Sequence, residues 1–240
     1  MSGVTTTPLT AAAALFDLDG TLIDSEPRSQ ELWRRLFAAH DIALTPALLA
    51  SFGGRRSADV IAEHLHRFGP GPTPDDLRAD LRRLDEETGL PEVRLKRGAR
   101  TLLTRLRDAG IPTALVTSGG LTYATHHLTR LEIDHFTTLV TADDVTRGKP
   151  DPEGYLLACR RLGVDPRQAL VFEDSTAGIQ AARAGGAACI AVGDPGPAAA
   201  AETLAVVHDL ADTPEIRPAV GTAYQDVAKA GSLPRDTTEN

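Results

Sequence analysis

The sequence is poor in cysteine and has no long apolar run, and each shortage excludes a class of protein. Its two cysteines, Cys159 and Cys189, stand outside any CxxC or metal-ligand spacing. We therefore expect reduced packing residues rather than a disulfide framework or a catalytic thiol. No apolar run reaches the roughly 18 residues that a membrane span needs, so no membrane partner is expected. The start of the chain lacks a basic region followed by an apolar stretch, which predicts no signal peptide and a cytoplasmic protein.

Basic residues are also too few for a nucleic-acid-binding surface. The chain has 25 Lys and Arg against 33 Asp and Glu, a formal net charge of −8 and a pI of about 5.4. A nucleic-acid partner is therefore not expected. A small anionic substrate is still compatible with this composition, because the local charge of a site decides what binds there.

The 240 residues and an apolar fraction of 42% predict one large domain, or one domain with a smaller insert. Short apolar runs alternate with helical patterns, as expected for a parallel sheet that is covered on both faces. The predicted strands lie at 11–16, 114–116, 139–140, 169–172 and 189–192, and the helices between them at 100–109, 151–162 and 177–184. Glycines follow these helices, which is a common stop signal. The sequence thus predicts a doubly wound, Rossmann-like α/β core.

Residues 26–92 have a different pattern, with apolar residues at helical spacing and no strand-like run. We predict helices at 26–40, 57–68 and 74–88, and therefore a helical insert in the α/β core. The predicted core comprises residues 1–25 and 93–212. Residues 213–240 contain three prolines and little periodicity, so we expect a surface tail that is in part disordered.

Polar residues follow the predicted strands, where ligands bind to parallel α/β sheets. Carboxylates are the ligands that Mg²⁺ prefers, whereas hydroxyls, loop N–H groups and lysine suit a phosphate. Reaction at phosphorus with Mg²⁺ is therefore the chemistry that the pattern indicates. The candidate residues are Asp17, Asp19, Thr117, Ser118, Lys149, Glu173 and Asp174.

Each of these residues also has a purely structural interpretation. Asp17 and Asp19 point the same way in an extended segment, so one could attack phosphorus while the other transfers protons. Alternatively, Asp-Gly forms a turn at a strand end. Thr117 and Ser118 could cap a helix, and Lys149 could be a solvated loop residue.

The combined pattern resembles a known family. Four segments are similar to the four motifs of the haloacid dehalogenase superfamily. They are Asp17–Thr21, Val116–Ser118, Gly148–Pro150 and Glu173–Ser175. The resemblance spans roughly residues 12–212 and implies the family's core with an inserted helical cap. Residues 22–27 further resemble the subgroup of β-phosphoglucomutase and small sugar-phosphate phosphatases.

The resemblance implies a role for each motif residue. Asp17 would be the nucleophile that takes the phosphoryl group, and Asp19 the general acid and base. Thr117, Ser118 and Lys149 would bind the phosphoryl group. Mg²⁺ would be held by the carboxylates of Asp17 and Asp174 and the backbone carbonyl of Asp19, with Glu173 supporting the metal site.

The resemblance extends to the insert. The segment Phe52–Ser57 is similar to the family's substrate-specificity loop, so Arg55 or Arg56 could face the substrate, as could Glu26 at the start of the insert. Each arginine could equally be a surface residue. In mutases of the subgroup a histidine lies in the first cap helix. The corresponding positions here, residues 27–29, hold none, which favours a hydrolase.

The favoured hypothesis is a Mg²⁺-dependent phosphatase of a small phosphorylated sugar, polyol or cyclitol, acting through an aspartyl-phosphate as a monomer or weak homodimer. A sugar-phosphate mutase is the first alternative. A receiver-like signalling module also combines acids, a hydroxyl and a lysine on such a sheet. Asp19, the insert and the length of the chain favour the enzyme.

Overall fold

The computed structural model describes residues 8–87 and 89–219 and centres on a six-stranded sheet. The strands lie in the order β6–β5–β2–β7–β8–β9, and every neighbouring pair runs parallel. This confirms the predicted doubly wound α/β core. The strands are Ala13–Phe16 (β2), Thr113–Val116 (β5), Thr138–Val140 (β6), Ala169–Glu173 (β7), Ala188–Val192 (β8) and Ala205–Val207 (β9).

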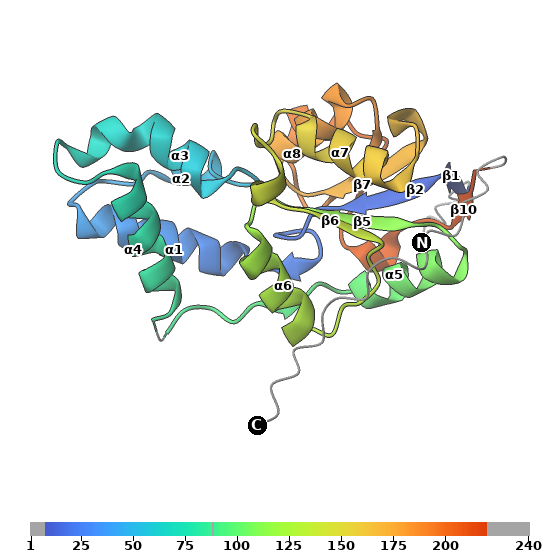
Figure 1. The fold of residues 1–240 in the computed structure, drawn as a ribbon, viewed down its shortest axis with the longest axis horizontal. Coiled ribbons are helices and arrows are strands. Elements are labelled where there is room, and N and C mark those ends of the chain that lie inside the picture. Colours follow the sequence, from blue (N-terminus) through green and yellow to red (C-terminus); the bar gives the residue numbers. More distant parts are fainter. Residues whose placement is uncertain (1–7, 88, 220–240) are drawn as a thin grey trace.

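Helices cover both faces of the sheet. In Figure 1, α5 (Ala99–Asp108) and α6 (Leu121–Arg130) lie below it, whereas α7 (Glu153–Leu162) and α8 (Thr176–Ala184) lie above it. Successive strand residues point to opposite faces, so each face has its own apolar cluster. Phe16 and Phe172 from neighbouring strands stack on one face, with ring centroids 4.6 Å apart. The two cysteines lie in the other cluster, buried and unpaired.

The remaining helices of the core are short. They are α9 (Pro197–Ala200) and three 3₁₀ turns at Ala142–Asp144, Pro166–Gln168 and Leu210–Asp212. Capping residues mark where the longer helices α7 and α8 end or begin. Gly163 ends α7 in a left-handed conformation, and the Ser175 hydroxyl accepts the N–H of Gly178 at the start of α8.

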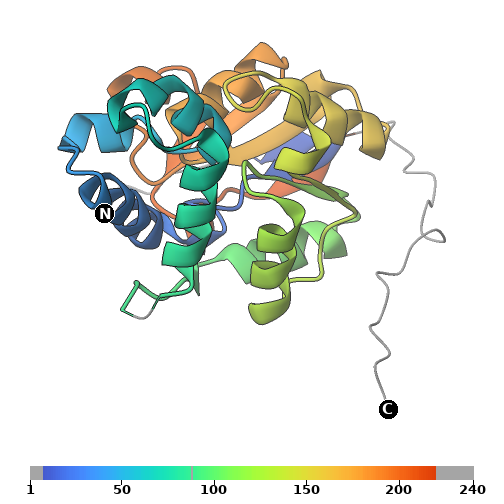
Figure 2. The same cartoon turned by 60° about the vertical axis from the view of Figure 1, so that its left-hand side comes forward.

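The helical insert consists of α1 (Glu26–Ala39), α2 (Pro46–Ala50), α3 (Ser57–His64) with a 3₁₀ turn (Leu65–Phe68), and α4 (Pro74–Asp85). It has an apolar cluster of its own, built around Trp33, Phe37 and Phe52. Trp33 is therefore a packing residue. Figure 2 turns these helices to the front of the core. The helix predicted to reach residue 88 ends at Asp85, and residue 88 lies outside the described residues.

A two-stranded ribbon joins the insert to the core. β3 (Ile23–Asp24) pairs antiparallel with β4 (Arg94–Leu95), so the chain leaves the core and returns to it at adjacent points. Next to this ribbon, Arg28 ties two parts of the insert together, because its guanidinium donates to the Asp85 carboxylate over 2.6 Å and to the Pro91 carbonyl over 3.4 Å. The first turn of α1 is thereby tied to the end of α4.

The expected tail is in part a strand. β10 (Ile216–Pro218) pairs parallel with β1 (Leu9–Ala11), which a bend at Ala12 separates from β2. The Glu215 carbonyl accepts the N–H of Leu9 over 2.8 Å, so this pairing holds the first described strand to the end of the core. The expectation of disorder falls on residues 220–240, outside the described range. None of the described helices is both long enough and apolar enough to cross a membrane.

Candidate active site

The site forms where β2, β5 and β7 end side by side. Asp17, Thr117 and Asp174 each follow one of these strands, and β2 lies between the other two. The Phe172 carbonyl accepts the N–H of Asp17 over 3.0 Å, and the Val140 carbonyl accepts that of Thr117 over 2.9 Å. Strand pairing therefore continues one residue past the strands and fixes the backbone from which these side chains project.

Lys149 connects two of the carboxylates. Its Nζ lies 2.5 Å from Asp17 Oδ1 and 2.5 Å from Glu173 Oε1, and also donates to the Val116 carbonyl over 3.2 Å. The three charged side chains are almost completely buried. Burial lowers the pKa of Lys149, but the Asp17 and Glu173 charges outweigh this and raise it overall, so the ammonium is charged at neutral pH.

Glu173 acts as an anchor. Its Oε1 accepts hydrogen bonds from Lys149 and the Tyr155 phenol, and its Oε2 accepts from the Asp174 N–H and from the N–H and hydroxyl of Ser175. Five donors therefore use both oxygens of this fully buried carboxylate. It holds the lysine and the loop after β7 in place.

The carboxylates fit a divalent cation. Asp17, Glu173 and Asp174 each offer an oxygen within 4.8 Å of the others. Three carboxylates face one ammonium, so two negative charges remain unbalanced when all are ionised. Carboxylate oxygens and a deficit of two positive charges suit a hard ion such as Mg²⁺.

Burial of these acids shifts the pKa of Asp17 and of Asp174. Burial raises the pKa of Asp17 well above its ordinary value, Lys149 opposes the rise, and Glu173 adds to it. Burial, and then the Glu173 charge, raise the pKa of Asp174 to about 8. Without a cation, Asp17 and Asp174 therefore hold protons more tightly than exposed acids do.

Gly20 gives Asp174 its space. Its φ is +79°, and a Cβ built on it would lie 1.9 Å from Asp174 Oδ2. Thr21 completes the arrangement by donating to Asp174 Oδ1 over 3.1 Å. A side chain at position 20 would thus displace a candidate metal ligand.

We expect Gly20→Ala to raise the Mg²⁺ concentration for half-maximal activity at least about tenfold, the effect typical of disturbing the surroundings of a metal ligand. Gly110→Ala is the matched control, since Gly110 has a φ of +70° but open space around it. Both variants carry the backbone strain of a left-handed alanine. Titration of activity with Mg²⁺ checks the difference, and equal shifts in the two variants would contradict it.

Asp19 lies apart from the salt bridge. Its Oδ1 accepts hydrogen bonds of 2.6 Å from Ser25 Oγ and 2.6 Å from Tyr123 Oη. Burial, and then the Asp19 charge, raise the pKa of Tyr123 far above its ordinary value, so the phenol keeps its proton and acts as a donor. Sequence reasoning missed Tyr123, because a tyrosine within a helix carries no motif signal.

Of the other candidates, Ser118 bonds across the boundary between core and insert. The Thr117 hydroxyl accepts the Gly119 N–H over 3.0 Å, and Ser118 Oγ donates to the Gly54 carbonyl over 2.7 Å. Glu26 accepts from Gln30 over 2.9 Å and lies close enough to Asp174 to raise its pKa. Of these residues, Glu26 is thus near the carboxylates, and the roles of all of them toward a substrate remain predictions.

The two arginines of the insert differ in their partners. Arg55 pairs with Glu63 inside the insert, 2.5 Å apart. Arg56 forms two hydrogen bonds with Asp59, of 2.7 and 2.8 Å, and also donates to the Val145 and Thr146 carbonyls of the core over 3.2 and 3.0 Å. Arg56 thus bridges insert and core.

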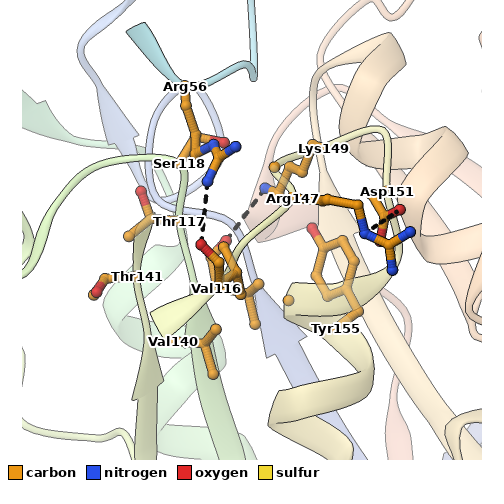
Figure 3. A pocket seen from close by; sticks show the side chains of 13 residues that line it. Arg56, Val116, Thr117, Ser118, Val140, Thr141, Arg147, Lys149, Asp151 and Tyr155 are labelled. Atoms are coloured by element: carbon orange, nitrogen blue, oxygen red, sulfur yellow. Dashed lines mark hydrogen bonds and ion pairs between the residues drawn. The ribbon is translucent and has the colours of Figure 1, made fainter. Parts of the chain in front are cut away.

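Behind Lys149 lies a small cavity of about 20 Å³, room for about one water molecule. Figure 3 shows Arg56, Ser118 and Lys149 together at its upper rim and the Tyr155 phenol pointing toward the lysine. The Lys149 ammonium lies 5.2 Å from the centre of the Tyr155 ring. The ring and the Glu173 carboxylate therefore support the lysine from behind.

The chain is similar to known hydrolases. A family profile of haloacid dehalogenase-like hydrolases matches residues 11–186, which include every carboxylate described above. The chain is 44% identical over 178 residues to the validoxylamine A 7'-phosphate phosphatase of Streptomyces hygroscopicus subsp. limoneus, covering 74% of this chain and 83% of the relative. It is 37% identical over 185 residues to hexitol phosphatase A of Escherichia coli (strain K12), covering 75% and 82%. A solved structure of a hydrolase from Pseudomonas syringae superposes with a TM-score of 0.73 at 27% identity, covering 83% of this chain and 94% of the other.

Proposed function

The chain belongs to the haloacid dehalogenase-like hydrolase family, and from this premise we propose that it is a Mg²⁺-dependent phosphatase of small phosphorylated metabolites. The observation that carries the proposal is that Asp17, at a strand end, lies close to both Lys149 and Asp174. A nucleophile, a cation partner and a candidate metal ligand are thereby within reach of one phosphoryl group. The names of the two relatives support a sugar, polyol or cyclitol phosphate as substrate.

In the first step, an Asp17 oxygen attacks phosphorus and the bond to the alcohol oxygen breaks. Asp19 donates a proton to that oxygen as it leaves. Lys149 stabilises the negative charge of the phosphoryl oxygens, and the Thr117 hydroxyl is a further donor. When bound by Asp17, Asp174 and the Asp19 carbonyl, with Glu173 in support, Mg²⁺ would offset the repulsion between the nucleophile and the phosphate.

In the second step, Asp19 takes a proton from water, and the resulting hydroxide attacks the phosphorus of the aspartyl-phosphate. The bond between phosphorus and the Asp17 oxygen breaks, and inorganic phosphate leaves. Asp19 has regained its proton, so the two steps balance. Positioning and charge neutralisation account for most of the catalysis in such a transfer.

Phosphate release over a panel of phosphorylated sugars, polyols and cyclitols tests the proposal. We expect release that requires Mg²⁺ and stops when the metal is chelated. A mutase would instead convert one sugar phosphate into its isomer with little free phosphate. Activity that persists in chelator, or no release from any member of the panel, would contradict the proposed function.

We further propose that the helical insert, residues 26–92, acts as a cap over the site. Arg56 and the Ser118–Gly54 hydrogen bond hold it against the loops that follow β5 and β6. A closed cap excludes bulk water from the reaction.

Removing the bridge in Arg56→Ala is expected to lower kcat/KM about tenfold, because hydrogen bonds from a charged group contribute about 1.5–3 kcal/mol. Arg67→Ala, which removes an exposed arginine of the insert, is the control and should stay within about twofold of the unaltered protein. Arg55→Ala separates the two arginines, since Arg55 pairs with Glu63 of the insert and, among the described residues, forms no hydrogen bond or ion pair with the core. A larger loss in Arg55→Ala than in Arg56→Ala in steady-state kinetics would contradict the bridging role.

A further inference from the structure

The Asp19 carboxylate is held through one oxygen only. Oδ1 accepts both short hydrogen bonds, from Ser25 and from Tyr123. Within residues 8–87 and 89–219, Oδ2 has no hydrogen-bond or ion-pair partner. Two donors on Oδ1 restrict rotation of the carboxyl group, so Oδ2 is the oxygen that is left to exchange a proton.

We propose that Tyr123 is a positioning residue, whose phenol orients Asp19 so that Oδ2 faces the leaving group and the attacking water. The inference rests on the phosphatase function proposed above and adds a residue from outside the four motifs. Tyr123 itself does not transfer a proton. It donates to Oδ1 throughout, while the proton leaves Oδ2 for the alcohol oxygen and is replaced from water.

The core holds the Tyr123 ring in place from two sides. The His127 ring packs edge-on against it, with centroids 4.5 Å apart. On another side lies Gly119, where a Cβ would come within 2.7 Å of Tyr123 Cδ1. Glycine at this position therefore leaves the space that the phenol needs to reach Asp19.

The two donors on Oδ1 come from different parts of the molecule. Ser25 is the residue before α1, at the junction with the helical insert. Tyr123 belongs to α6, which lies against the sheet on the same face as α5 (Figure 1). The Tyr123 hydrogen bond therefore comes from the core alone, whereas the Ser25 bond is made at the junction with the insert.

Tyr123→Phe tests the proposal, since it removes only the hydroxyl. With a sugar phosphate, whose leaving oxygen needs a proton, we expect kcat to fall about 10- to 100-fold, part of the 10²- to 10⁴-fold that acid–base catalysis contributes. KM should stay within about twofold, because Tyr123 has no place in the phosphate-binding set. With p-nitrophenyl phosphate, whose leaving group departs as an anion, the rate constant of the initial burst should be unchanged while later turnover slows.

Ser25→Ala should also lower kcat with a sugar phosphate. Thr129→Val changes an exposed residue of α6, the helix that holds Tyr123, and should leave kcat unchanged. The burst rate constant does not depend on the fraction of folded protein, so it separates positioning from loss of structure. Unchanged kcat in Tyr123→Phe, or equal losses in the burst and in sugar-phosphate turnover, would overturn the role of Tyr123 alone. No phosphate release by the unaltered protein would instead overturn the proposed function, and this inference with it.

Discussion

Replacing Asp17 by asparagine is expected to abolish phosphate release, with a loss of at least about 10⁴-fold in kcat, the scale seen when a nucleophile is removed. An amide has nearly the size of a carboxylate but carries no charge and does not attack phosphorus. Asp108→Asn makes the same chemical change at an exposed helix end, where the side chain is 70% exposed, and should keep full activity. Measurable turnover in Asp17→Asn, after exclusion of deamidation by mass spectrometry, would contradict the role of Asp17.

The same substitution should not destabilise the metal-free protein. The pKa of Asp17 is raised chiefly by burial, so its ionised form costs folding free energy at neutral pH. Asparagine removes that charge, and Lys149 keeps Glu173 as a partner. We expect Tm in chelator at pH 8 to rise, whereas a fall of more than about 5 °C would mean that the Lys149–Asp17 pair stabilises the fold.

Metal-free protein is expected to lose stability as the pH rises from about 4 to about 8. The pKa of Asp174 is raised from 3.8 to about 8, so the folded state keeps a proton in this range that the unfolded state has released. Proton binding therefore stabilises the folded state below pH 4, and this contribution disappears as the pH passes 8. The pKa of Asp17 is also raised, so this residue contributes to the pH dependence in the same direction. Thermal denaturation in chelator across this range measures the effect, and Asp174→Asn should reduce it.

Mg²⁺ should reverse this loss, because a cation replaces the protons. At a concentration about 1,000 times its Kd, a ligand adds ~4 kcal/mol of stability, which raises Tm by ~10 °C in a chain of this size. The increase should be larger at pH 8 than at pH 5, where protons compete for the same oxygens. Asp174→Asn should remove most of it. A Tm that does not change when Mg²⁺ is added at pH 8 would contradict a metal site at Asp17 and Asp174.

The sheet and the placement of the acids could be predicted, because both follow from short-range patterns. Apolar runs that alternate with helices specify a parallel sheet, and the carboxyl ends of parallel strands meet at one edge. Asp17 and Asp174 therefore lie near each other although 157 positions separate them in the sequence. Strands as short as β3 and β10 have too few residues to show a period.

Contacts between insert and core could not be predicted in the same way. Ser118 has the residue type of a phosphate ligand, yet its hydroxyl meets the Gly54 carbonyl, and Arg56 meets backbone carbonyls. These partners depend on how two packed units lie against each other, which no local pattern specifies. Tyr123 was missed for a different reason, since a tyrosine within a helix carries no motif signal that would connect it to Asp19.

The β3–β4 ribbon has a consequence for how such proteins diversify. Ile23 pairs with Leu95 and Asp24 with Arg94, so the chain enters and leaves the insert through this one ribbon. A change in the length of the insert therefore leaves the register of the central sheet intact, because the two ends of the insert stay side by side in the ribbon. The strand ends that carry Asp17 and Asp174 keep their places when the proposed cap changes.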